Sequence, residues 1–108
     1  MRDDYYNHML TSLLADLKAM VTINEPKTMT QLKTMDVKAW EKTNVLVEGL
    51  YAYESNGPDK LIEFYKYQLY PIISSGTIYK KGFHKYYAIR IDDFDFRMLI
   101  SNCEKLIF

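Results

Sequence analysis

Apolar residues recur every three or four positions along most of this chain, and that spacing places side chains on one face of an α-helix. The clearest stripes run through Leu10, Leu13 and Leu17 near the start and through Leu99 and Cys103 near the end. Helices with such stripes pack together around a shared core. The pattern predicts helices over residues 4–21, 37–54, 58–69 and 93–107, and a short helix over residues 27–35.

Polar and turn-forming residues mark the ends of these predicted helices. Asp36, and Asp92 or Asp93, stand just before a helical stripe, where an aspartate can accept hydrogen bonds from free backbone N–H groups. The third long helix is expected to end after about residue 69, because Pro71 has no N–H to give to a helix interior and Ser74-Ser75-Gly76 is typical of a turn. The segment Ser55–Pro58 predicts the turn before that helix.

The period of the pattern changes from helical to alternating after Gly76. Tyr87, Ile89 and Ile91 occupy every second position, and Lys81-Gly82 has the composition of a tight turn. We therefore predict a single late β-hairpin over about residues 77–91. A hairpin alone is marginally stable in water, so this one is expected to pack on the helices. The expected fold is α+β and mostly helical, with four to five helices around one core in a single domain of residues 1–108.

Charge and cysteine content narrow the class of protein. The 108 residues carry fourteen basic and fourteen acidic groups, which argues against a histone-like nucleic-acid binder with a large positive excess. The charge is uneven, since residues 60–91 hold six basic groups and only one acid, Glu63. One cysteine cannot form an internal disulfide, and no signal peptide or membrane-length apolar run is visible. A cytoplasmic protein without membrane association is expected.

Sequence patterns typical of catalytic or metal-binding sites are weak in this chain. His8, His84 and Cys103 are too few for a structural zinc site, and the thiol lies on an apolar stripe where cysteine is usually inert. The acidic cluster of residues 92–95 lacks the glycine and distal glutamate of a calcium loop, so helix capping explains it better. With no nucleophile motif and no phosphate-binding loop, we predict no catalytic residue, no cofactor and no enzyme activity.

The hairpin carries the densest group of candidate binding residues. Aromatic rings interleaved with basic groups can stack on bases while holding phosphates, and they can equally bind an acidic protein surface. The plain structural alternative is a solvated turn whose lysines protect a strand edge from aggregation. The candidate partner-binding residues are Tyr79, Lys80, Lys81, Phe83, His84, Lys85 and Tyr86.

A helix-turn-helix or winged-helix DNA-binding regulator is the alternative hypothesis. The short helix over 27–35 and the helix that follows it would form the DNA-binding pair, with Lys33, Lys38 and Lys42 on the phosphates. Glu41 on the same helix would face the DNA backbone unfavourably.

The favoured hypothesis is a non-enzymatic interaction protein, a small regulator or inhibitor that acts by binding a partner macromolecule. It rests on the lack of visible chemistry and on ten tyrosines, a residue type enriched at protein interfaces. Another protein is the expected partner, and an acidic surface on it is one alternative, while nucleic acid or a second copy of the chain also stays open. The small size and the content of lysine, tyrosine and isoleucine fit an accessory protein of a phage or mobile element.

Overall fold

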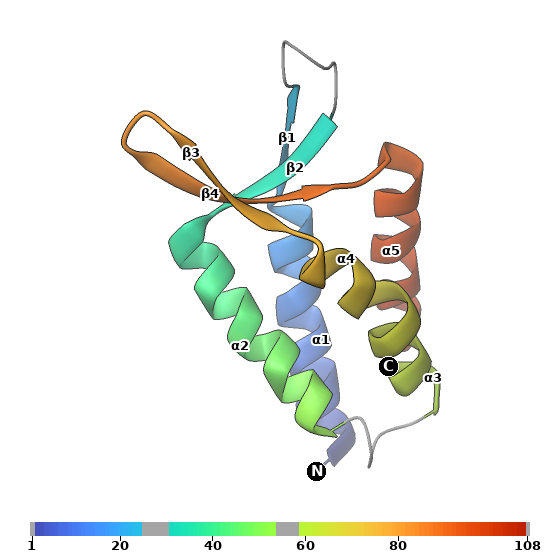
Figure 1. Cartoon of the computed structure of the whole chain (residues 1–108). Coiled ribbons are helices and arrows are strands. Elements are labelled where there is room, and N and C mark those ends of the chain that lie inside the picture. The colour runs from blue at the N-terminus through green and yellow to red at the C-terminus, as the bar shows by residue number, and fades with distance from the viewer. Residues whose placement is uncertain (1, 25–30, 54–58, 108) are drawn as a thin grey trace.

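The computed structural model describes residues 2–24, 31–53 and 59–107, which form helices and an antiparallel sheet (Figure 1). The α+β, mostly helical class predicted from the sequence is confirmed. In chain order the elements are helix α1 (Arg2–Lys18), strands β1 (Val21–Asn24) and β2 (Gln31–Asp36), helices α2 (Val37–Tyr53) and α3 (Asp59–Glu63), the π-helix η2 (Phe64–Leu69), helix α4 (Tyr70–Ser74), strands β3 (Thr77–Lys81) and β4 (His84–Arg90), and helix α5 (Asp93–Leu106).

The sheet is larger than the sequence predicted. Among the described residues it has four strands in the order β1-β2-β4-β3, and every neighbouring pair is antiparallel. The late hairpin exists as β3 and β4, but it is not alone, because β2 pairs with β4 and β1 pairs with β2. The predicted helix over residues 27–35 is wrong where it can be compared, because Gln31–Asp36 is a strand. Residues 27–30 and 55–58 lie outside the described residues.

Buried polar residues explain why β2 was missed. Its inner residues, 32–35, are all buried, but Lys33 and Thr34 are polar, so the segment shows neither an alternating pattern nor an apolar run. A strand of this kind does not show the alternation of apolar and polar residues that marks a half-exposed strand. β1 begins at Val21, which the helical pattern had assigned to the first helix.

The helices gather on one side of the sheet (Figure 1). Helix α1 packs against both α2 and α5, and the apolar stripes predicted on these helices form the main core. A second, smaller cluster lies under the sheet and includes Tyr87, Ile89, Ile91 and Phe96, with Trp40 packed against it. None of the described helices is both long and apolar enough to cross a membrane.

The helix starts predicted at Asp36 and Asp92 are confirmed, whereas the end predicted near residue 69 is wrong and the helical path stops at Ser74-Ser75-Gly76. Asp36 accepts a hydrogen bond from the Lys38 N–H at 2.9 Å, and Asp92 accepts one from the Phe94 N–H at 2.7 Å. The helical path continues past Pro71 to Ser74 because η2 widens the turn before it. The Tyr70 N–H bonds to the carbonyl five residues back, a spacing that leaves room for a proline.

Candidate functional site

The β3–β4 hairpin is formed by local geometry that its sequence supports. Gly82 opens a two-residue loop with φ of 64°, the left-handed conformation that such loops need at their first position. Strand pairing then aligns Lys81 with His84, Lys80 with Lys85 and Tyr79 with Tyr86. The hairpin therefore brings all of the predicted partner-binding residues together, with six of them in opposed pairs and Phe83 in the loop.

Tyr87 anchors the inner end of the hairpin to two helices. Its ring stacks on Trp40 of α2 with ring centroids 3.6 Å apart and 2° between the ring planes. Its hydroxyl donates a hydrogen bond to the Ile73 carbonyl oxygen of α4. Burial raises the pKa of Tyr87, an effect only partly offset by the Gly76 backbone, so the hydroxyl stays protonated and can donate at neutral pH. These contacts fix the direction in which the hairpin leaves the body of the protein.

The loop end of the hairpin projects away from the helices (Figure 1). Phe83 is fully exposed there, and Lys80, Lys81, His84 and Lys85 are exposed as well. Tyr79 and Tyr86 are half-buried. The ring of His84 meets that of Tyr86 edge-on, with centroids 5.6 Å apart.

The candidate residues divide between the two faces of the hairpin, because side chains alternate along a strand. Ile78, Lys80 and Lys85 share the face on which Tyr87 packs toward the helices. The opposite face carries Tyr79, Lys81, His84 and Tyr86. A partner that touches all of these residues must therefore hold the hairpin from both sides or along its edge.

Among the described residues the lysines of the hairpin form no ion pair, and Asp36, which lies opposite Tyr86 on the neighbouring strand β2, caps α2 with its carboxylate. The sequence has no acidic residue between Glu63 and Asp92. Exposed charges of one sign that gather on a projecting turn attract a partner of the opposite sign.

The residues proposed for DNA binding lie on two different elements, and one of them is buried. Lys33 lies on β2 and is only 7% exposed, with its ammonium 2.5 Å from Thr22 Oγ1 and 2.5 Å from Asp93 Oδ1. Its hydrogen bond and its charge lower the pKa of Asp93. Lys38 and Lys42 are exposed on α2, but the element before α2 is a strand. The helix-turn-helix pair predicted from the sequence is therefore wrong.

The described residues offer little that resembles an active site. Cys103 is fully buried, as predicted, and burial raises the pKa of its thiol to about 11, so the reactive thiolate is scarce at neutral pH. His8 and His84 lie on α1 and on the hairpin, and the described histidine, cysteine and acidic side chains form no group of three placed to hold a metal ion. Asp92 instead caps α5.

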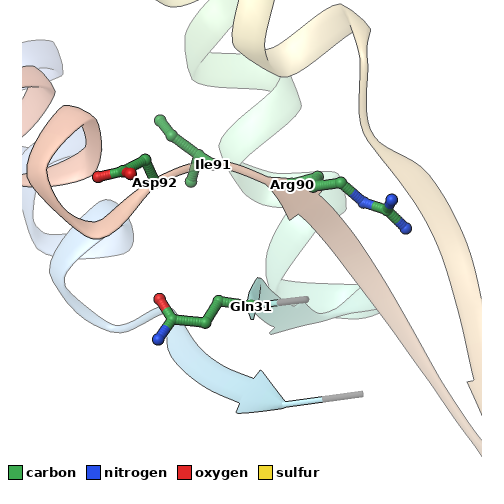
Figure 2. Close-up of a pocket in the computed structure, with 4 residues that line it drawn as sticks. All are labelled: Gln31, Arg90, Ile91 and Asp92. Atoms are coloured by element: carbon green, nitrogen blue, oxygen red, sulfur yellow. The ribbon is translucent and has the colours of Figure 1, made fainter. Parts of the chain in front are cut away.

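Arg90 borders three surface hollows that the sequence did not single out. One has a volume of about 430 Å³ and is lined by Gln31, Arg90, Ile91 and Asp92. Figure 2 shows the Arg90 guanidinium pointing away from the Asp92 carboxylate, so these charged groups do not converge on one point. The second, of about 480 Å³, lies where the end of β4 meets η2, α4 and α5, and the third, of about 360 Å³, lies on the outer side of the sheet. The lack of convergence in the first hollow makes it a weaker candidate than the hairpin.

Comparison of the chain with models of protein families, with curated proteins and with solved structures finds no match. The geometry and charge of the chain itself are therefore the basis for a functional proposal. Among the described surfaces, the hairpin combines a projecting shape (Figure 1), a fully exposed aromatic ring and exposed lysines that form no ion pair with another described residue.

Proposed function

We propose that this protein is a non-enzymatic interaction protein that regulates or inhibits a partner protein by binding it through the β3–β4 hairpin. The observation that supports this most strongly is Phe83, a large apolar side chain that is fully exposed at the loop. Such exposure contributes nothing to the stability of the folded chain, whereas insertion into a pocket of a partner would bury the whole ring. Aromatic anchors of this kind supply much of the binding energy at protein interfaces.

The charge around Phe83 favours a partner with an acidic surface. Lys80, Lys81 and Lys85 are exposed within a few positions of the ring and take part in no ion pair with another described residue. Complementary charge of this kind speeds the encounter of two proteins more than it slows their separation. The lysines and the ring therefore have separable kinetic roles.

Those roles define the test of the proposal. The partner is first captured by cross-linking from the native host through a photoreactive residue at position 83, then purified for kinetic binding measurements. Lys80→Glu with Lys81→Glu should slow association, whereas Phe83→Ala should speed dissociation. Both changes are on the surface and should leave the free energy of unfolding within about 0.5 kcal/mol.

A matched control comes from α2, where Lys38 and Lys42 are also exposed. Lys38→Glu with Lys42→Glu makes the same change in net charge on α2 instead of on the loop end of the hairpin, and it should leave partner binding intact. Loss of binding in this control, with normal binding by the hairpin variants, would contradict the proposal.

DNA binding, the alternative hypothesis, is tested on the same variants with duplex and single-stranded oligonucleotides as probes. Binding to nucleic acid falls steeply as salt rises because counterions are released from the phosphates. Tight, salt-sensitive binding to duplex DNA that depends on Lys38 and Lys42 would replace the proposal with a DNA-binding function. An interface anchored by Phe83 should depend much less on salt.

A further inference from the structure

Strand β3 is an outer strand of the sheet, and the function proposed above assigns no role to its outer edge. In the described part of the chain, the strand order β1-β2-β4-β3 leaves β3 paired on one side only. Four of its five residues are exposed, and Ile78 is an apolar side chain that is 57% exposed. An outer strand presents unpaired backbone N–H and C=O groups to which another strand can bind.

The register of the hairpin indicates which backbone groups are available. In antiparallel pairs, residues that hydrogen-bond across the ladder alternate with residues whose backbone groups point outward. Lys81 and His84 flank a two-residue loop, where the flanking pair is of the hydrogen-bonded kind. The pattern then places the outward-facing backbone groups at Lys80 and Ile78.

We propose that the edge of β3 binds an extended segment of the partner protein, which adds to the sheet as a further strand. This inference rests on the proposed function and specifies how the hairpin would hold its partner. The segment would place two neighbouring acidic residues beside Lys80 and Lys81, and two neighbouring apolar residues beside Ile78 and Tyr79. Because side chains alternate between faces, each face of the added strand would carry one acidic and one apolar residue.

Charge complementarity favours this occupant over a second copy of the chain. Pairing of β3 with β3 of another copy would bring the lysines of both strands together along one edge, and like charges across strands are destabilising. Lysines on outer strands are a common protection against such self-pairing. The same lysines favour an acidic strand, so they select between the two occupants.

The first test uses a display library of random short peptides, selected on the full chain. Enriched peptides should contain an acidic pair next to an apolar pair. Addition of such a peptide should slow hydrogen exchange at the amides of Ile78 and Lys80 by about tenfold or more, since these amides become hydrogen-bonded. The inference is wrong if the enriched peptides lack the acidic pair, or if a bound peptide does not slow hydrogen exchange at these two amides.

The second test separates the contribution of the β3 backbone to peptide binding from the contribution of its lysine charge. Lys80→Pro removes the outward N–H and the charge, while Lys80→Thr removes only the charge and suits a strand. Proline is tolerated on outer strands where the N–H faces solvent, and circular dichroism checks that each variant stays folded. Lys80→Pro should bind the selected peptide at least about tenfold more weakly than Lys80→Thr, the expected loss for about one hydrogen bond of 1.4 kcal/mol.

The outcomes also separate this inference from the proposed function. If Lys80→Pro and Lys80→Thr bind the partner equally, strand addition is wrong, while continued sensitivity to Phe83→Ala supports binding by the hairpin through its side chains. Insensitivity to every hairpin variant overturns both. A dimer of the chain that Lys80→Pro dissociates would show that a second copy, not an acidic segment, occupies the edge.

Discussion

Replacement of Gly76 by alanine should destabilise the protein, because the residue lies against the ring that anchors the hairpin. A methyl group at Gly76 would overlap the Tyr87 hydroxyl and would lie 2.7 Å from Tyr87 Cε1, so the ring must move. Movement weakens the stack on Trp40, which is worth about 1 kcal/mol, and the hydrogen bond to Ile73, which is worth about another 1 kcal/mol.

Two further effects of opposite sign complete the estimate. Crowding of a packed site adds roughly 1 kcal/mol of destabilisation. Alanine also lowers the conformational entropy of the unfolded chain relative to glycine, which stabilises the folded protein by about 0.7 kcal/mol. The expected net loss for Gly76→Ala is about 2 kcal/mol, or roughly 8 °C in Tm for a domain of this size. Urea unfolding followed by circular dichroism measures the free energy, and thermal unfolding measures Tm.

A double-mutant cycle tests the stated cause. Tyr87→Phe removes the hydroxyl, the atom nearest to the added methyl group, and the hydrogen bond to Ile73 that Gly76→Ala would weaken, although the overlap with Cζ remains. Gly76→Ala should then destabilise the Tyr87→Phe protein by about 1 kcal/mol less than it destabilises the wild type. Equal losses in both backgrounds, or a Gly76→Ala protein as stable as the wild type, would refute the reasoning.

Gly82 provides a control, because a substitution there is unfavourable through the backbone conformation and not through contact of the new side chain with its neighbours. Its φ is 64°, and a side chain there would meet nothing within 4 Å. Gly82→Ala should cost about 1 kcal/mol, and Gly82→Asn should cost less because asparagine tolerates the left-handed conformation. At Gly76 the cost comes from overlap with the Tyr87 ring, so Gly76→Asn should destabilise the protein at least as much as Gly76→Ala.

Other expected outcomes concern the thiol, acid stability and metals. Cys103 should react with a maleimide only as fast as the protein unfolds, because the thiol is buried and its pKa is about 11; Cys103→Ala should cost about 1 kcal/mol in unfolding free energy. The pKa of Asp93 is lower in the folded chain, so its stabilising effect is complete above about pH 4 and is lost as pH falls through that lower pKa; Asp93→Asn should flatten this loss in acid unfolding curves. EDTA should leave Tm unchanged, and a drop of more than a few degrees would reveal a metal that the fold requires.

The sequence determined the features that depend on neighbours in the chain. The apolar stripes predicted α1, α2 and α5, and Asp36 and Asp92 marked helix starts, because a cap accepts its hydrogen bond from an N–H two residues away. Gly82 and the alternation after it predicted β3 and β4 for the same reason. The sequence also placed Phe83 next to the predicted Lys81-Gly82 turn, and the structure shows that its side chain is fully exposed there.

Only the tertiary structure decided the features that depend on distant partners. β2 is a strand because β1 and β4 pair with it, and Lys33 is buried because Asp93, sixty positions away, supplies its counter-charge. The order of the strands makes β3 an outer strand, although its residues resemble those of any hairpin. Sequence periodicity reports how residues within a few positions share a face, whereas sheet order and ion pairs are set by which distant segments meet during folding.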